Sequence, residues 1–319
     1  MHDLPAAMMT PSHWINSFIE EQSLPASYAE TVVDHCLPLA AKIAQWSQCS
    51  TTPLIVGING AQGTGKSTLS EILKLSLNHK YGLDTAILSI DDIYLTYAER
   101  EQLAQDIHPL LKTRGVPGTH DIKLGTKILH TLKNKTPCRL PVFDKARDER
   151  APDSQWIDVD QAVDVILFEG WCVGARPQQN LALADPVNRL EELDDDDCSW
   201  RHYVNDALKG PYQNLFGLID RLVMLKAPNF EYVHTWRNEQ EKKLSTRLTQ
   251  QGHHDHTQLK LMSPQQIERF IMHYERLTRW MLSEMPDRTD CVFHLNPDHQ
   301  VDRVCWSTKP SSPHNHDST

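Results

Sequence analysis

One short segment decides the fold: Gly60-Ala61-Gln62-Gly63-Thr64-Gly65-Lys66-Ser67, which follows the apolar run 54–58. A strand, a glycine-rich loop and a helix start in this order are typical of a P-loop. Glycines allow successive backbone N–H groups to turn inward around phosphate oxygens. Lys66 would place its charge on the β- and γ-phosphates, and Ser67 would offer a hydroxyl to Mg²⁺. The segment therefore predicts ATP and Mg²⁺ as cofactors. The expected nucleotide-binding residues are Gly60, Ala61, Gln62, Gly63, Thr64, Gly65, Lys66, Ser67 and Thr68.

The rest of the chain alternates short apolar runs with longer amphipathic stretches, which is typical of βαβ units. We expect an α/β protein with the P-loop NTPase fold, in which helices flank a mostly parallel five-stranded sheet. The predicted strands are 54–58, 85–90, 163–168, 221–225 and 291–295, with a short irregular strand possible at 139–143. The predicted helices are 66–79, 96–105, 121–133, 201–209, 229–251 and 263–284.

Three parts of the chain differ in pattern. Apolar residues at helical spacing between residues 12 and 46 predict two helices, so residues 1–50 form an N-terminal helical extension. We expect residues 51–306 to form one P-loop domain, with the predicted helix 229–251 as a helical lid. The segment 307–319 is rich in Ser, Pro, His and Asp, and we expect a disordered tail.

Two neighbouring carboxylates, Asp91 and Asp92, end the second predicted strand. The carboxyl ends of parallel strands face the ligand crevice in open α/β sheets. An alcohol kinase needs a carboxylate there to orient the hydroxyl and accept its proton. We expect Asp91 to be this base, with Asp92 or Tyr94 near the substrate or the metal. The alternative is a solvated Asp-Asp loop or a helix N-cap.

A third apolar strand, Val163–Phe168, ends in Glu169. This layout is typical of a Walker-B strand, whose carboxylate holds Mg²⁺ directly or through water. The expected metal-binding residues are thus Ser67, Asp92 and Glu169.

Two charged, turn-rich segments, 114–121 and 141–150, supply Arg, Lys and His groups that an anionic substrate would need. They could equally be plain surface loops. Together with the carboxylate at the second strand, the expected substrate-binding residues are Asp91, Tyr94, Arg114, His120, Asp144 and Lys145. In the lid, Arg237 is expected to close on the γ-phosphate, so the expected catalytic residues are Lys66, Asp91 and Arg237.

The acidic run Glu191–Asp197 lacks the spacing of a calcium loop, and we expect a solvated acidic turn. The whole chain has a formal net charge of -10, which argues against nucleic acid or an anionic membrane as a partner. Its seven cysteines are scattered without a C-x-x-C pair and indicate reduced thiols. No targeting or membrane-spanning pattern is visible, so a cytoplasmic location is expected. Oligomeric state is left open, because no coiled-coil or repeat signature is visible.

Seven segments together resemble the glycerate kinase family of P-loop kinases, which are related to uridine kinase, phosphoribulokinase and bacterial pantothenate kinase. They are GINGAQGTGKSTLS (57–70), SIDDIYLTYAER (89–100), RGVPGTHD (114–121), PVFDK (141–145), LFEGWCVG (167–174), WRNEQE (236–241) and SPQQIERFIMHYERLT (263–278). The resemblance implies transfer of phosphate from ATP to D-glycerate, a small hydroxy acid, giving 3-phosphoglycerate. It also implies that Asp91 is the general base, Glu169 the Walker-B acid and Arg237 the lid arginine. Residues 146–150 are compressed relative to the family.

Two other functions remain open from the residues alone. The first is a kinase of the same fold for another acceptor, such as a nucleoside or pantothenate. The second is a regulatory P-loop ATPase, although paired carboxylates fit an alcohol acceptor better than a water-activating site.

Overall fold

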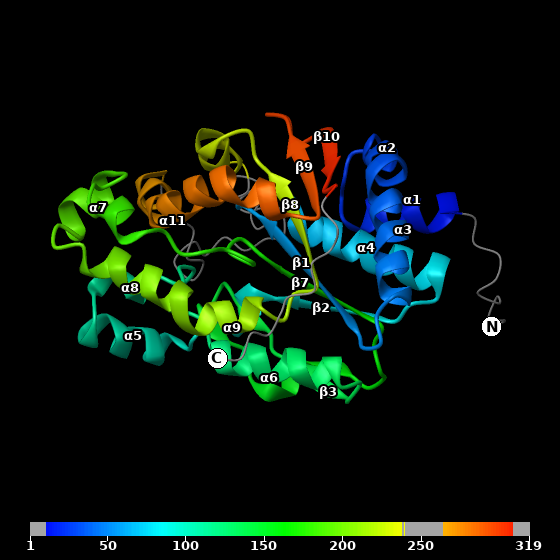
Figure 1. The fold of residues 1–319 in the computed structure, drawn as a ribbon, viewed down its shortest axis with the longest axis horizontal. Helices are drawn as coiled ribbons and strands as arrows, with labels where there is room; N and C mark the ends of the chain where they lie inside the picture. Colours follow the sequence, from blue (N-terminus) through cyan, green and yellow to red (C-terminus); the bar gives the residue numbers. More distant parts are fainter. Residues whose placement is uncertain (1–10, 238, 240–263, 309–319) are drawn as a thin grey trace, which may run out of the picture.

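The computed structural model describes residues 11–237, 239 and 264–308 (Figure 1). Its helices are α1 (Pro11–Glu21), α2 (Tyr28–Thr31), α3 (Leu37–Gln48), α4 (Lys66–Tyr81), α5 (Tyr97–Asp106), α6 (Ile122–Lys133), α7 (Arg189–Asp194), α8 (Ser199–Ala207), α9 (Gln213–Phe216) and α11 (Pro264–Glu284). Residues 230–237 are also helical. A π-helical stretch, Val32–Cys36, joins α2 to α3.

The central sheet has six strands in the order β10-β9-β8-β1-β7-β2. They are β1 (Leu54–Gly60), β2 (Thr85–Ser89), β7 (Val165–Gly170), β8 (Arg221–Lys226), β9 (Cys291–Leu295) and β10 (Val301–Trp306). All of these strands except β10 pair in parallel, which confirms the predicted parallel sheet. Strand β10 pairs antiparallel to β9. The sequence missed β10 because a register shift between Val301 and Arg303 breaks its alternation and most of the strand is exposed.

Four short strands lie outside this sheet. They are β3 (Cys138–Leu140), β4 (Phe143–Asp144), β5 (Glu149–Arg150) and β6 (Ile157–Val159), and they pair as β3-β6 and β4-β5. The possible strand at 139–143 is thus split between two small antiparallel sheets. The β4-β5 hairpin carries the charged segment 141–150 toward the ends of β2 and β7, because Phe143 N donates to the side chain of Asp92.

Helices cover both faces of the sheet. On one face, a hydrophobic cluster joins α1, α3 and α4 to residues such as Val56, Val165 and Phe293. On the other face, a second cluster joins α6, α9 and α11 to residues such as Ile55 and Phe168. Successive strand residues point to opposite faces, so strands buried on both sides read as continuous apolar runs. This is why the parallel strands were visible in the sequence.

The N-terminal helices share the first of these clusters with the sheet. The division at residue 50 stays a prediction, as does the tail, of which residues 309–319 lie outside the described part of the chain. No helix among the described residues is long and apolar enough to cross a membrane. The cytoplasmic location stays a prediction.

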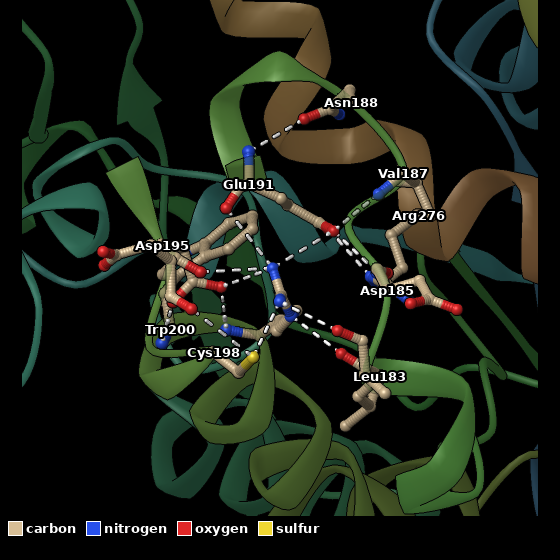
Figure 2. A network of polar contacts seen from close by, with 12 residues as sticks. Leu183, Asp185, Val187, Asn188, Glu191, Asp195, Cys198, Trp200 and Arg276 are labelled. Atoms are coloured by element: carbon tan, nitrogen blue, oxygen red, sulfur yellow. Dashed lines mark hydrogen bonds and ion pairs between the residues drawn. The ribbon is translucent and has the colours of Figure 1, made fainter. Parts of the chain in front are cut away.

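The acidic run Glu191–Asp197 is only in part the solvated turn that we expected: four of its carboxylates are exposed, but those of Glu191 and Asp195 are buried. Figure 2 shows Glu191 and Asp195 inside a polar network at α7 and the start of α8. Both side chains are fully buried. Glu191 accepts hydrogen bonds from Arg276 of α11, with Nε at 2.8 Å and Nη2 at 2.6 Å, while Asp195 lies 3.4 Å from Nη1 of Arg201. Buried carboxylates require such partners.

We expect Glu191→Ala to lower the free energy of unfolding by about 3–5 kcal/mol, because Arg276 and Arg201 would be left as buried charges without this partner. Urea denaturation measures the change. Asp194→Asn is the matched control: Asp194 pairs with Arg269 at an exposed site, so its loss should cost less than about 1 kcal/mol. Equal effects of the two substitutions would contradict the stabilising role of the buried network.

Candidate active site

The phosphate-binding loop connects β1 to α4 as the sequence predicted. Gly63 and Gly65 have φ angles of 84° and 86°, and Gly65 is the N-cap of α4. A Cβ on Gly60 would come within 2.5 Å of Oγ1 of Thr64, whose hydroxyl donates to the carbonyl of Ala61. These positions therefore need glycine for two reasons, the left-handed backbone and the close approach of the loop to itself.

Two residues that the sequence reasoning missed cover this loop. A Cβ on Gly63 would come within 2.7 Å of Cβ of Trp236, which is almost fully buried. The ring of His299 stacks on Trp236, with 4.3 Å between centroids, and its Nδ1 donates to the carbonyl of Gly63 over 3.0 Å. Trp236 directly precedes Arg237 in a segment we had singled out, whereas His299 lies in a polar turn that carries no sequence signal.

The three predicted metal-binding residues line one cleft of about 500 Å³, which runs along α4 and the open edge of β2. Ser67 donates to Oε1 of Glu169 over 3.1 Å. The other oxygen of Glu169 is buried without a hydrogen-bond partner in the described part of the protein. Burial raises the pKa of Asp92 to about 6, and the charges of Asp91 and Glu169 act in the same direction. Hydroxyl and carboxylate oxygens are ligands that Mg²⁺ prefers, so this set fits the ion.

Asp91 lies in a short 3-10 helix, Ile90–Ile93, directly after β2. Its Oδ1 accepts from the hydroxyl of Tyr94 and its Oδ2 from Nζ of Lys145, each over 2.7 Å. Burial opposes ionisation of Asp91, but the nearby charges of Lys145 and Lys66 outweigh it and hold the pKa well below its usual range. Ser89, not Asp91 or Asp92, caps this helix. The alternative of an N-cap or a solvated Asp-Asp loop is therefore wrong for Asp91.

His120 is buried behind Tyr94, and the two rings stack with 4.6 Å between centroids. Burial lowers the pKa of His120 to about 3, so the ring is neutral near pH 7. Its Nδ1 lies 2.6 Å from the hydroxyl of Tyr212, which also accepts from the backbone N–H of Gly118. His120 therefore offers no positive charge to an anionic substrate, although we expected it to bind such a substrate partly for its charge.

The loop 114–121 is anchored firmly, not a plain surface loop. Nε1 of Trp171 donates to the carbonyl of Gly115, and the hydroxyl of Tyr274 in α11 donates to the carbonyl of Arg114, each over 2.9 Å. Gly115 has a φ of 126°, and a Cβ there would lie 2.0 Å from Oη of Tyr274. Trp171 and Tyr274 belong to motif segments in the sequence, but nothing in their spacing revealed this contact.

The hairpin of β4 and β5 brings Lys145 to Asp91 but leaves Asp144 apart. Oδ1 of Asp144 accepts from the backbone N–H groups of Ala146 and Arg147, so it shapes its own turn. Arg114 lies over the ring of Phe143, 5.5 Å from its centroid, and pairs with Asp148. The structure thus brings Tyr94 and Lys145 onto the carboxylate of Asp91, and the charge of Arg114 acts on Tyr94.

Arg237 lies in the helical residues 230–237, with its guanidinium 5.5 Å from the ring centroid of Phe270 in α11. Burial raises the pKa of Tyr274, and the charge of Arg237 partly opposes this effect. Arg237 therefore lies against α11, the helix whose Tyr274 contacts the loop 114–121. The remainder of the predicted lid helix, apart from residue 239, lies outside the described residues.

Comparisons with known proteins find similar kinases, although no family model matches the chain. An uncharacterized kinase of Schizosaccharomyces pombe, mug58, is 32% identical over 256 residues, which cover 77% of this chain and 85% of the relative. The chloroplastic D-glycerate 3-kinase of Arabidopsis thaliana is 32% identical over 59% of this chain and 41% of its own length. The solved structure of D-glycerate 3-kinase from Cryptococcus neoformans is 26% identical, with a TM-score of 0.70, covering 86% of this chain and 99% of that one.

Proposed function

Because this chain belongs to the P-loop kinase family that includes D-glycerate 3-kinase, uridine kinase, phosphoribulokinase and pantothenate kinase, we propose that it phosphorylates D-glycerate to 3-phosphoglycerate with ATP. That it is an ATP-dependent small-molecule kinase follows from the family. The observation that carries the finer proposal is the cluster at the end of β2, where an ionised Asp91 pairs with Lys145 while Arg114 lies over Phe143 of the same hairpin.

The nucleotide side of the site is built by the P-loop. The loop N–H groups and the start of α4 receive the phosphates, and Lys66 adds a point charge to the β- and γ-phosphates. Ser67, Glu169 and Asp92 would hold Mg²⁺, which supplies charge neutralisation of the triphosphate when bound. Arg237 would meet the γ-phosphate during transfer.

The acceptor side is built by Asp91 and its neighbours. Asp91 orients the reacting hydroxyl and accepts its proton as the acceptor oxygen bonds to the γ-phosphoryl group and the bond to ADP, the leaving group, breaks. Tyr94 fixes the direction of this carboxylate through its hydroxyl. Lys145 and Arg114 supply positive charge for the carboxylate of a small hydroxy acid. His120 is neutral and contributes shape behind Tyr94. Asp144 would act only by holding the turn before Lys145.

An acceptor panel tests this proposal. Coupled ADP release with Mg·ATP would be measured for D-glycerate, L-glycerate, uridine, pantothenate and ribulose 5-phosphate. We expect D-glycerate to raise the rate far above the background hydrolysis and the other acceptors to leave it near background. Turnover with uridine or pantothenate alone would assign the chain to another acceptor. Hydrolysis that no acceptor raises would favour a regulatory ATPase.

A further inference from the structure

One carboxylate at the edge of the candidate active site joins two arginines. Asp148 ends the turn between β4 and β5. Its Oδ1 lies 2.9 Å from Nη2 of Arg100 and also accepts a hydrogen bond from Nη1 of Arg114. The side chain is largely buried, so solvent screens neither contact strongly. Asp148 therefore links helix α5 to the loop 114–121.

The two arginines play different parts. Arg100 is only 1% exposed, and it donates to the carbonyl oxygens of Leu95, Lys112 and Asp148 in addition to the carboxylate. The N–H donors of Arg100 are thus used in hydrogen bonds within the protein. Arg114 is 24% exposed and lies over the ring of Phe143. A guanidinium carries about five N–H donors, and the bond to Asp148 uses one of them, so Arg114 can receive a further anion.

The charges of this group do not cancel. Two guanidinium groups face one carboxylate, which leaves one positive charge in excess, and Arg114 is the member that presents it to solvent. Burial works against the charge of Arg114, but Asp148 more than compensates and raises its pKa. The neighbouring Lys145 is already paired with Asp91. The excess charge therefore lies on Arg114, which is near enough to Tyr94 to act on the pKa of the hydroxyl that bonds Asp91.

We propose that Asp148 is a positioning residue that directs the guanidinium of Arg114 toward the carboxylate of the acceptor. The inference rests on the proposed function, because it assigns the acid group of the hydroxy acid to Arg114. Asp148 has a φ of 59°, a left-handed conformation that Asp and Asn tolerate better than most residues. Its backbone carbonyl is also held by Arg100, so the carboxylate has little freedom. Arg114 is thereby oriented before the acceptor arrives, which lowers the entropy cost of binding.

Asp148→Asn tests this role, because Asn is nearly isosteric and tolerates the same backbone. We expect the KM for D-glycerate to rise about 10- to 100-fold, the effect of losing a hydrogen bond to a charged group, while kcat and the KM for ATP stay close to wild type. Asp194→Asn is the matched control, since it removes the exposed Asp194–Arg269 pair, which lies outside this group of three side chains, and should leave all three constants unchanged.

A second variant covers the case in which Asp148→Asn does not fold. Arg114→Gln leaves the pair of Asp148 with Arg100 intact and should raise the same KM by at least as much. If the variants keep the wild-type KM for D-glycerate, or lose only kcat or affinity for ATP, the positioning role is overturned. The proposed function would still stand. Failure of the wild-type protein to phosphorylate D-glycerate would instead overturn the proposed function and, with it, this inference.

Discussion

Asp91→Asn is expected to lower kcat with D-glycerate by about 10²- to 10⁴-fold, the usual contribution of a positioned proton acceptor. The amide keeps the shape of the side chain but cannot accept the hydroxyl proton. It also loses the charge that attracts Lys145 and Lys66. The KM for ATP should change little, because the P-loop and the start of α4 are untouched. Steady-state kinetics with both substrates varied measures the two effects separately.

Tyr94→Phe is the control for this substitution. It removes one hydrogen bond to Asp91 but leaves the carboxylate ionised and paired with Lys145. We expect a loss well below that of Asp91→Asn. A similar loss in both variants would indicate that the geometry of this cluster, not proton transfer to Asp91, limits the rate. Full activity of Asp91→Asn would remove Asp91 from the mechanism.

Lys66→Met is expected to lower kcat/KM for ATP by about 10²- to 10³-fold, as removal of one donor that stabilises developing charge usually does. Lys66 lies at the first position of α4, where its charge adds to that of the helix N-terminus. It also helps to keep Asp91 ionised, so its loss should raise the pKa of Asp91. The variant should therefore be impaired in the affinity for ATP and in kcat, as initial-rate measurements would show.

Lys74→Met is the matched control, because Lys74 lies on the same helix about two turns further along. It lines the cleft beside α4 but lies away from the phosphate-binding loop. Its substitution should leave kcat/KM near the wild-type value. Equal losses in the two variants would mean that any lysine on this helix matters only through the net charge of the protein.

The parallel sheet could be predicted because strands buried on both faces appear as uninterrupted apolar runs. The loops that follow those strands gather at one edge, so Ser67, Asp91 and Glu169 could be expected together from their order alone. β10 could not be predicted, since its exposed residues and broken alternation resemble a polar loop. The composition of the chain gives no signal for such an edge strand.

The acidic run shows a second limit. A cluster of Asp and Glu is usually solvated. Buried Glu191 pairs with Arg276, and buried Asp195 pairs with Arg201. Arg276 lies on α11, far from Glu191 in the sequence. No local sequence pattern indicates that a distant arginine packs against this run in the folded protein. The sequence predicted the charges correctly but not the tertiary contact that decides their burial.

The hairpin of β4 and β5 shows the same limit inside the candidate site. Asp144 follows the motif residue Phe143, and we expected it to contact the substrate. The structure uses it to hold the turn, while Asp148 reaches Arg100 and Arg114. Asp148, not Asp144, pairs with the two arginines, and Asp148 has a left-handed backbone conformation. A local sequence pattern does not determine that conformation.

The central claim is tested most directly by following the γ-phosphate itself. ATP labelled in the γ-position would be incubated with the wild-type protein, Mg²⁺ and D-glycerate, and the labelled products separated and identified. We predict that the label appears in 3-phosphoglycerate, and that the Asp91→Asn variant loses this product. Label found only in inorganic phosphate, with or without D-glycerate, would contradict the account.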